Sequence, residues 1–477
     1  MKHTSGLTRR HFLRAASGFA GASMLGVTPF RAFAQATDLM PSNRCFVFLY
    51  FSGGWDVLLS LDPRDPLVFT PERVSETRIL PGYDLLATDG SFPEGLVTPT
   101  QRSGGPPPAM SFGPAIGRLA DHYDQLAVVR GINMTTVAHE VGFRYFLTGK
   151  SPNGNAARGS STATEIVGQM KPSQPVASIA YGIESYNDRY PGYANALRVS
   201  RASDLILALK PSATMMDSEI EQQLVDLRGK PVTCESQLYD TRGLVDQYRD
   251  ARAQMTSVLG SQLYRAFDLD FEPGNMADPT VDQRNQARAA IRMQYNLPAT
   301  GAINYDAPAA RAAMIAVALK RGISQCVSMN LVGGLDTHFG TQISHAINQR
   351  SGWNALADMV SDLRASPHPA GGTFMDHTTI LAFSEFSRTP LINGAGGRDH
   401  HISSSALLIG AGIRHNLVFG RAGDINMAPG LIDRNTGLPV PKGMNILPEH
   451  IIATVLASAK LDYSITRVEP LPGLLSG

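Results

Sequence analysis

Short, nearly unbroken runs of apolar residues are the main structural signal along this chain. The runs are Cys45–Phe51, Leu126–Val129, Cys326–Val332, Thr378–Phe383 and Ala406–Ile409. A strand that is covered on both faces needs apolar side chains on both, so such runs indicate buried strands of a parallel sheet. We therefore expect these segments to form one central sheet.

Apolar residues at helical spacing separate the predicted strands. The expected helices are Gly117–Tyr123, Val137–Leu147, Ala309–Lys320, a crossover helix through Leu356, Met359, Val360 and Leu363, and a C-terminal helix that starts at Pro448. Each crossover helix leads into the next strand, which is typical of α/β crossover connections. This alternation predicts an α/β fold, specifically a three-layer α/β/α sandwich with a mostly parallel central sheet.

The remaining segments predict one domain, over residues 37–477, with two excursions. Residues 62–114 are rich in proline, glycine, aspartate and threonine, which is typical of a long surface segment. Residues from about 217 to 300 carry charged, helical patterns, including Glu219–Leu227 and Leu244–Arg265, without a strand signal. We expect a mainly helical insertion there, in a position to cover or shape a cleft.

The N-terminus predicts a twin-arginine signal peptide over residues 1–36. Arg9 and Arg10 precede a weakly hydrophobic stretch, Ala15–Val27, and small residues around Ala34 and Ala36 provide cleavage sites. A membrane anchor fits less well, because glycine and serine dilute a segment shorter than the roughly 20 apolar residues that span a bilayer. We expect recognition by the twin-arginine export machinery, a periplasmic or secreted product, and no stable membrane span after cleavage.

Charge and cysteine content narrow the classes of partner. The formal net charge is +1, from 42 basic and 41 acidic residues, which provides no electrostatic footprint for nucleic acid or an anionic membrane. Cys45, Cys234 and Cys326 are scattered and odd in number, which argues against a disulfide framework. Cys45 and Cys326 lie in strand-like runs and are expected to be buried apolar residues.

Metal-ligating residue types follow the ends of the predicted strands. The candidate ligands are Asp56, Asp336, His338, Glu385, Asp399, His400 and His401. Each of them alone is more often a satisfied buried polar group than a ligand. Their coincidence at strand ends, which meet at one edge of a parallel sheet, favours a shared site for a divalent metal: zinc, calcium, magnesium or manganese.

Further residues near these positions have candidate catalytic roles. Thr135 and Thr136 precede a predicted helix, where a hydroxyl either caps the helix or acts as a nucleophile. Arg388 and Arg398 either neutralise carboxylates or bind an oxyanion. His139 is open to three roles: a core histidine, a metal ligand or a general acid.

Several motifs together resemble the exported domain-of-unknown-function 1501 family, which is placed in the alkaline phosphatase-like superfamily of phosphatases, sulfatases and phosphomutases. They are the twin-arginine leader, Ser52-Gly53-Gly54-Trp55-Asp56, Phe146–Pro152, Ala266–Leu269, Gly333–His338, Ser384–Arg388 and Gly397–His401. The resemblance implies that Asp56 binds one metal. It also implies that Asp336-Thr337-His338 replaces a D-x-x-x-H pair, and that His400 or His401 is the final ligand.

These patterns predict an exported metal-dependent hydrolase of phosphate or sulfate esters, with a small-molecule or glycan ester as substrate. The alternative is a non-catalytic periplasmic binding or assembly protein on a phosphatase-like scaffold, because no Cys/Ser-x-Pro-x-Arg sulfatase signature is present. The hydrolase prediction requires Asp56, Asp336, His338, Glu385 and one of His400 and His401 to converge within roughly 4 to 5 Å of a common point. Thr135 or Thr136 should face the same point.

Overall fold

A computed structural model describes residues 43–87, 90–210, 219–220, 223, 226, 263–274, 280–340 and 342–476. The predicted signal peptide lies outside the described residues, as does most of the predicted insertion, including five of the nine residues of Glu219–Leu227 and all but the last three of Leu244–Arg265. The described part of the insertion contains the helices α10 (Tyr264–Phe267) and α11 (Thr280–Gln294).

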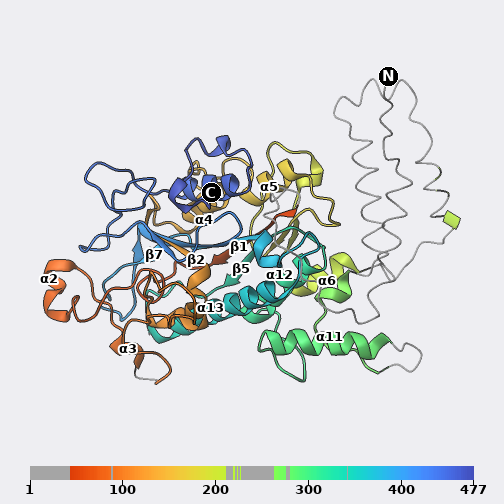
Figure 1. The fold of residues 1–477 in the computed structure, drawn as a ribbon, viewed down its shortest axis with the longest axis horizontal. Coiled ribbons are helices and arrows are strands. Elements are labelled where there is room, and N and C mark those ends of the chain that lie inside the picture. The colour runs from red at the N-terminus through yellow and green to blue at the C-terminus, as the bar shows by residue number, and fades with distance from the viewer. Residues whose placement is uncertain are drawn as a thin grey trace. The chain divides into compact units, whose positions relative to one another are not determined.

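An eight-stranded sheet lies at the centre of the described chain (Figure 1). Its order is β10 (Leu417–Phe419), β2 (Leu126–Asn133), β9 (Ser403–Gly410), β6 (Thr378–Phe383), β1 (Cys45–Phe51), β5 (Cys326–Val332), β3 (Ile179–Tyr181) and β4 (Leu197–Val199). Strand β9 is antiparallel to both of its neighbours, and the other pairs in this sheet are parallel. The prediction of an α/β fold with a mostly parallel sheet is confirmed.

Helices and short ordered turns connect the strands. They are η2 (Pro71–Arg73), α2 (Val74–Thr77), α3 (Asp84–Ala87), η3 (Pro114–Gln125), α4 (His139–Thr148), α5 (Thr162–Met170), η4 (Gly192–Ala194), α6 (Ala202–Leu209), α12 (Pro308–Lys320), α13 (Gln342–Ala365), α14 (Phe374–His377), α15 (Pro448–Ser458), η5 (Ser464–Thr466) and η6 (Pro472–Leu474). A separate two-stranded ladder pairs β7 (Ser387–Arg388) with β8 (His400–His401).

The two faces of the sheet are buried against different helices. On β1, Val47, Leu49 and Phe51 belong to a core cluster that includes α12 and α13. The alternate residues Phe46 and Phe48 belong to a second cluster with α4, α5 and α15. In Figure 1, α12 and α13 lie on the other side of the strands from α4 and α5. This arrangement explains the continuous apolar run of β1, because a strand alternates its side chains between faces.

Four predicted elements differ from the observed ones. The predicted strand Leu126–Val129 continues to Asn133 in β2. The predicted helix Gly117–Tyr123 belongs to the longer 3₁₀ segment η3, which bends at Gly117, where φ is 59°. The predicted helix from Val137 begins at His139, since Ala138 has an extended conformation. The predicted strand Ala406–Ile409 is longer and antiparallel, a direction that apolar runs do not encode. The strands β3, β4 and β10 are only three residues long and were not predicted.

None of the described helices is long and apolar enough to cross a lipid bilayer.

Candidate functional site

The carboxyl ends of β1, β5 and β6 meet at one edge of the sheet. Tyr50 of β1 lies opposite Asn330 of β5 and Phe383 of β6, so the three strands end at nearly the same level. Gly53 then brings the loop after β1 very close to the loop after β5, since a Cβ at Gly53 would lie 2.5 Å from the amide nitrogen of Asp336. Its φ of 114° is also in the region that favours glycine.

Three histidines and one aspartate converge at this edge. The Nε2 atoms of His139, His338 and His400 lie 3.5, 3.3 and 3.5 Å from a carboxylate oxygen of Asp336. The Nε2 atoms of His338 and His400 are 2.8 Å apart. His139 is the first residue of α4, Asp336 and His338 follow β5, and His400 begins β8. We call these four residues the histidine–aspartate cluster.

The second ring nitrogen of each histidine has its own acceptor. The Nδ1 atom of His139 lies 2.8 Å from Glu385, that of His338 lies 2.9 Å from Asp399, and that of His400 lies 2.7 Å from the carbonyl of Val137. Such acceptors keep the proton on Nδ1, so the lone pairs of Nε2 face the centre of the cluster. The same arrangement orients histidines that bind metals in proteins.

Arg388 holds the carboxylate of the cluster. Its guanidinium donates to Asp336 Oδ1 at 2.7 Å and to the carbonyl oxygens of Gly53 and Gly54. Partial burial of Asp336 opposes ionisation, but the hydrogen bond from Arg388 and the nearby His139 lower the pKa of this carboxyl below its ordinary value. Asp336 is therefore an anion, and half of its side chain, 51 %, is exposed toward solvent.

Glu385 supports His139 from inside the fold. Its carboxylate is buried and accepts hydrogen bonds from the amide of Gly53 at 2.9 Å and the hydroxyl of Ser384 at 2.8 Å. Burial would raise the pKa of Glu385, but the hydrogen bonds with His139, with its own backbone amide and with Ser384 lower it. The resulting anion raises the pKa of His139 through their hydrogen bond.

The cluster fits a divalent cation. Two ligands of one tetrahedral ion, each bound at about 2.0 to 2.1 Å, lie about 3.3 Å apart. The distances from Asp336 to each histidine and from His338 to His400, 2.8 to 3.5 Å, are close to this value. The group whose donor atoms all lie within 4.8 Å of one another consists of His139, Asp336 and His400 and does not include His338. Three imidazoles and a carboxylate suit zinc better than calcium or magnesium, which prefer ligands that are all oxygen.

The structure does not bring Asp56 to the cluster. Its carboxylate is buried and forms an ion pair with Arg398 at 2.9 Å, while its oxygen also accepts from the amide of Leu58. Arg398 in turn donates to the backbone carbonyls of Thr389, Leu80 and Pro81. These contacts hold Arg398 inside the fold, so it is not placed to bind an oxyanion at the cluster.

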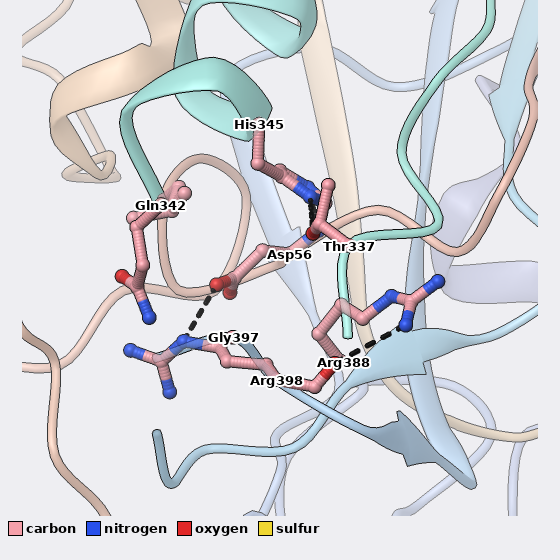
Figure 2. A pocket seen from close by; sticks show the side chains of 8 residues that line it. Asp56, Thr337, Gln342, His345, Arg388, Gly397 and Arg398 are labelled. Carbon is pink, nitrogen blue, oxygen red and sulfur yellow. Dashed lines mark hydrogen bonds and ion pairs between the residues drawn. The ribbon is translucent and has the colours of Figure 1, made fainter. Parts of the chain in front are cut away.

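A small polar cavity lies beside this ion pair (Figure 2). It measures about 10 Å³ and is lined by Asp56, Leu59, Thr337, Gln342, His345, Arg388, Gly397 and Arg398. A cavity of this size admits at most one water molecule. It is therefore too small for an organic ligand.

The side chains of His401 and Thr136 have other partners in the described contacts. His401 is buried and its Nδ1 accepts from the amide of Ser403. Thr135 is exposed with φ of 56°, and Thr136 Oγ1 accepts from the amide of Ala138. Among the described contacts, neither threonine hydroxyl bonds to a member of the cluster.

Two further residues contact the cluster or its loops, and neither is among the candidate ligands or catalytic residues. The ring of Phe386 packs against His139 and His400, with centroids 4.7 and 4.3 Å apart. His345 of α13 contacts Thr337, between the two cluster residues of the loop after β5. Phe386 directly follows Glu385, which was a usable signal, whereas nothing in the local pattern of α13 distinguishes His345.

These observations define the class: an α/β protein with a histidine–aspartate cluster at the carboxyl edge of a mostly parallel sheet. The chain belongs to the family described as "Protein of unknown function (DUF1501)", whose model matches residues 43–430. The matched region contains all four cluster residues.

No curated protein matches this chain. Among the solved structures, one titled "Crystal structure of Ps i-CgsB in complex with k-i-k-neocarrahexaose" is similar with a TM-score of 0.32 and 8 % sequence identity, over 90 % of this chain and 75 % of that chain. A similarity this low carries no argument about ligand or reaction.

Proposed function

We propose that this protein is an exported, metal-dependent hydrolase of phosphate or sulfate esters, on an alkaline phosphatase-like α/β/α sandwich. The observation that carries the proposal is the convergence of His139, His338 and His400 on the carboxylate of Asp336. An electron-rich group of this kind favours a cation at its centre. The phosphate or sulfate part is supported by the motifs that resemble the phosphatase and sulfatase superfamily.

In this proposal, the four cluster residues hold one zinc ion. A bound zinc ion would supply Lewis-acid chemistry, which polarises an ester oxygen and makes an attacking water more acidic. Glu385 and Asp399 keep the Nδ1 protons of His139 and His338 in place, and Arg388 orients Asp336. The nucleophile is a water molecule, since neither Thr135 nor Thr136 makes a described contact with the cluster.

The exposed side of the cluster supports a substrate with a sizeable organic group. Phe339 follows His338, its ring centroid lies 6.2 Å from the imidazole, and 83 % of the residue is exposed. An exposed aromatic ring offers a surface for an apolar group or for the C–H face of a sugar. This feature is consistent with a small-molecule or glycan ester.

The proposal is tested by elemental analysis of protein folded in metal-replete cells, followed by assays with 4-nitrophenyl phosphate and 4-nitrophenyl sulfate. We expect bound zinc, hydrolysis that a chelator abolishes, and a loss of at least 100-fold in kcat/KM in His400→Ala. His401→Asn is the matched control, because His401 is adjacent but lies outside the cluster. Absence of both bound metal and hydrolysis with added zinc would refute the proposal.

A second candidate is a non-catalytic binding or assembly protein. It is favoured by the position of Thr135 and Thr136, which leaves the site without a hydroxyl nucleophile in contact with the cluster. Asp336→Ala and His338→Ala distinguish the two, because a binding protein keeps its ligand and partners when the cluster is lost. A hydrolase loses its activity in both variants.

Export is also part of the proposal. A fusion of residues 1–36 to a reporter that is active only when exported in a folded state tests it directly. We expect transport that depends on the twin-arginine machinery and is lost when Arg9 and Arg10 are both replaced by lysine. Export of the lysine variant at the wild-type rate would contradict this part of the proposal.

A further inference from the structure

Thr337 separates the two cluster residues that follow β5, and its side chain is bound by a residue outside the cluster. The backbone between Gly333 and Thr337 has no regular secondary structure: Gly334 has a φ of 73°, and the amide of Thr337 donates to the carbonyl of Leu335 at 3.1 Å. The side chains of Asp336 and His338 meet at 3.3 Å, whereas the side chain of Thr337 bonds to α13. Thr337 Oγ1 contacts His345 Nδ1 at 2.8 Å, as Figure 2 shows.

The loop after β1 binds the other ring nitrogen of His345. This residue is buried near the start of α13, and its Nε2 accepts a hydrogen bond from the amide of Asp56 at 3.0 Å and lies 3.1 Å from Gln349 Oε1. An accepting Nε2 leaves the proton on Nδ1, so Nδ1 donates to Thr337. Burial, with the nearby Arg388 and Arg398, lowers the pKa of His345 to about 3, which keeps the ring neutral.

The neighbouring turn of α13 strengthens this connection. Gln349 donates to the carbonyl oxygen of Asp56 at 3.0 Å, so α13 binds both the amide and the carbonyl of that residue. Helix α13 also packs against η3 and α12 in the core. His345 therefore joins a rigid helix to the loops that follow β1 and β5.

We propose that His345 is a positioning residue that acts through Thr337 and sets Asp336 and His338 in the orientation in which they bind a cation. This inference rests on the proposed metal site and adds to it a part that lies outside the cluster. Without the hydrogen bond, Thr337 is free to rotate, and the two flanking side chains lose their fixed direction. Outer contacts of this kind contribute about 10- to 100-fold to metal affinity in proteins.

Replacement of the hydroxyl of Thr337 tests the inference with little change in volume. Thr337→Val removes the hydrogen bond, and Thr337→Ser keeps it. Titration with Co²⁺, followed by calorimetry and visible absorption, reports both the affinity and the ligand set. We expect Thr337→Val to bind Co²⁺ at least 10-fold more weakly with an altered spectrum, and Thr337→Ser to resemble the wild type.

Ser361→Ala is the matched control for a merely structural effect. Ser361 lies on the same helix, and its hydroxyl contacts Nε2 of the buried His122 at 3.1 Å, in another hydroxyl–imidazole pair. It lies roughly 24 Å from His345 along the helix axis. We expect this variant to bind Co²⁺ as the wild type does. Equal losses in Ser361→Ala and Thr337→Val, or no loss in Thr337→Val, would overturn the inference.

A measurement without metal separates this inference from the proposed function. The rings of His338 and His400 have centroids 4.5 Å apart, close enough for nuclear Overhauser contacts between their ring protons. We expect these contacts in the wild type and Thr337→Ser, and their loss in Thr337→Val. If the wild type binds no metal but the contacts are lost only in Thr337→Val, the metal site is refuted and the positioning role is supported. If the contacts persist in Thr337→Val, the positioning role alone is refuted.

Discussion

At the scale of single residues, the partners of the histidines differ in burial although they make similar hydrogen bonds. Glu385 is almost completely buried, with 1 % of its side chain exposed, whereas 55 % of the side chain of Asp399 is exposed. A charge inside the fold interacts more strongly with its partner than a charge in contact with water. Glu385 should therefore contribute more to the zinc affinity of the cluster than Asp399 does.

Glu385→Gln tests this difference, because it removes the charge and keeps the size. We expect zinc affinity to fall about 10-fold, since His139 loses the anion that orients it. Asp399→Asn should lower the affinity by much less, because solvent already screens this pair. Isothermal titration of both variants measures the effects. Equal losses in the two variants would contradict the importance of burial.

The buried histidines outside the cluster make stability depend on pH. Burial, with Arg102 and Arg364 nearby, lowers the pKa of His122 to about 4. Between about pH 6.5 and pH 4 the unfolded chain protonates this residue and the folded protein does not. Stability contributed by the neutral ring is thus present above pH 6.5 and is lost as the pH falls toward 4.

His122→Gln should weaken this dependence. We expect the free energy of unfolding of the wild type to fall between pH 6.5 and 4.5 by roughly 2 kcal/mol more than that of the variant. Urea denaturation at a series of pH values measures both slopes. Parallel slopes in the wild type and the variant would show that His122 does not contribute.

At the scale of elements, the site depends on how closely the loops after β1 and β5 approach one another. Each loop follows a parallel strand, and Gly53 occupies the point of contact with Asp336. The ladder of β7 and β8 adds the third side of the site, since it pairs Arg388 with His400. The loops and this ladder therefore place Asp336, His338 and His400. Helix α4 adds His139, and α13 contacts the loop after β5 through His345.

Gly53→Ala should disturb both the fold and the site. An added Cβ would lie 2.5 Å from Asp336 N at a φ of 114°, so the loop after β5 must shift. We expect a loss of about 2 kcal/mol or more in stability and weaker zinc binding. Gly104→Ala is the control, because Gly104 also has a positive φ, 72°, but a Cβ there would meet no atom within 4 Å. Its zinc affinity should be unchanged, and an equal loss of affinity would point to backbone strain alone.

At the scale of the whole molecule, one edge of the sheet carries the candidate site, and contacts at the opposite edge stabilise the fold. The carboxyl edge carries the cluster, and at the other edge the buried Arg44 directly precedes β1. Arg44 donates to the carbonyl of Ser458 at 2.7 Å, the hydroxyl of Thr379 at 2.5 Å and the carbonyl of Ala411 at 2.7 Å. It thereby joins β1 to β6, to the end of β9 and to α15.

Arg44→Met should lower stability and leave the site intact. Three acceptors lose their donor in the interior, so we expect a loss of about 3 kcal/mol in the free energy of unfolding. Zinc affinity should match the wild type, because Arg44 lies at the opposite end of β1 from the cluster. Urea denaturation and isothermal titration measure the two properties separately. A parallel loss of zinc affinity would show that the two ends of the sheet are coupled.

The sequence by itself determined the central strands and the edge of the sheet where a site should lie. Cys45–Phe51, Cys326–Val332 and Thr378–Phe383 form β1, β5 and β6 with the predicted bounds. This succeeded because apolar runs are a local property, and a strand buried on both faces must display one. The candidate residues Asp336 and His338 lie together because both follow β5 at that edge. His400, at the start of β8, joins them there.

Only the tertiary structure decided which of the candidates face one another. Asp56 also follows a strand at this edge, but its side chain meets Arg398 in the interior. His139, whose role the sequence left open, reaches the cluster because α4 starts beside it, and His345 acts from a helix that carries no such signal. The direction of a side chain past the end of a strand depends on loop geometry and on distant partners, and local periodicity encodes neither.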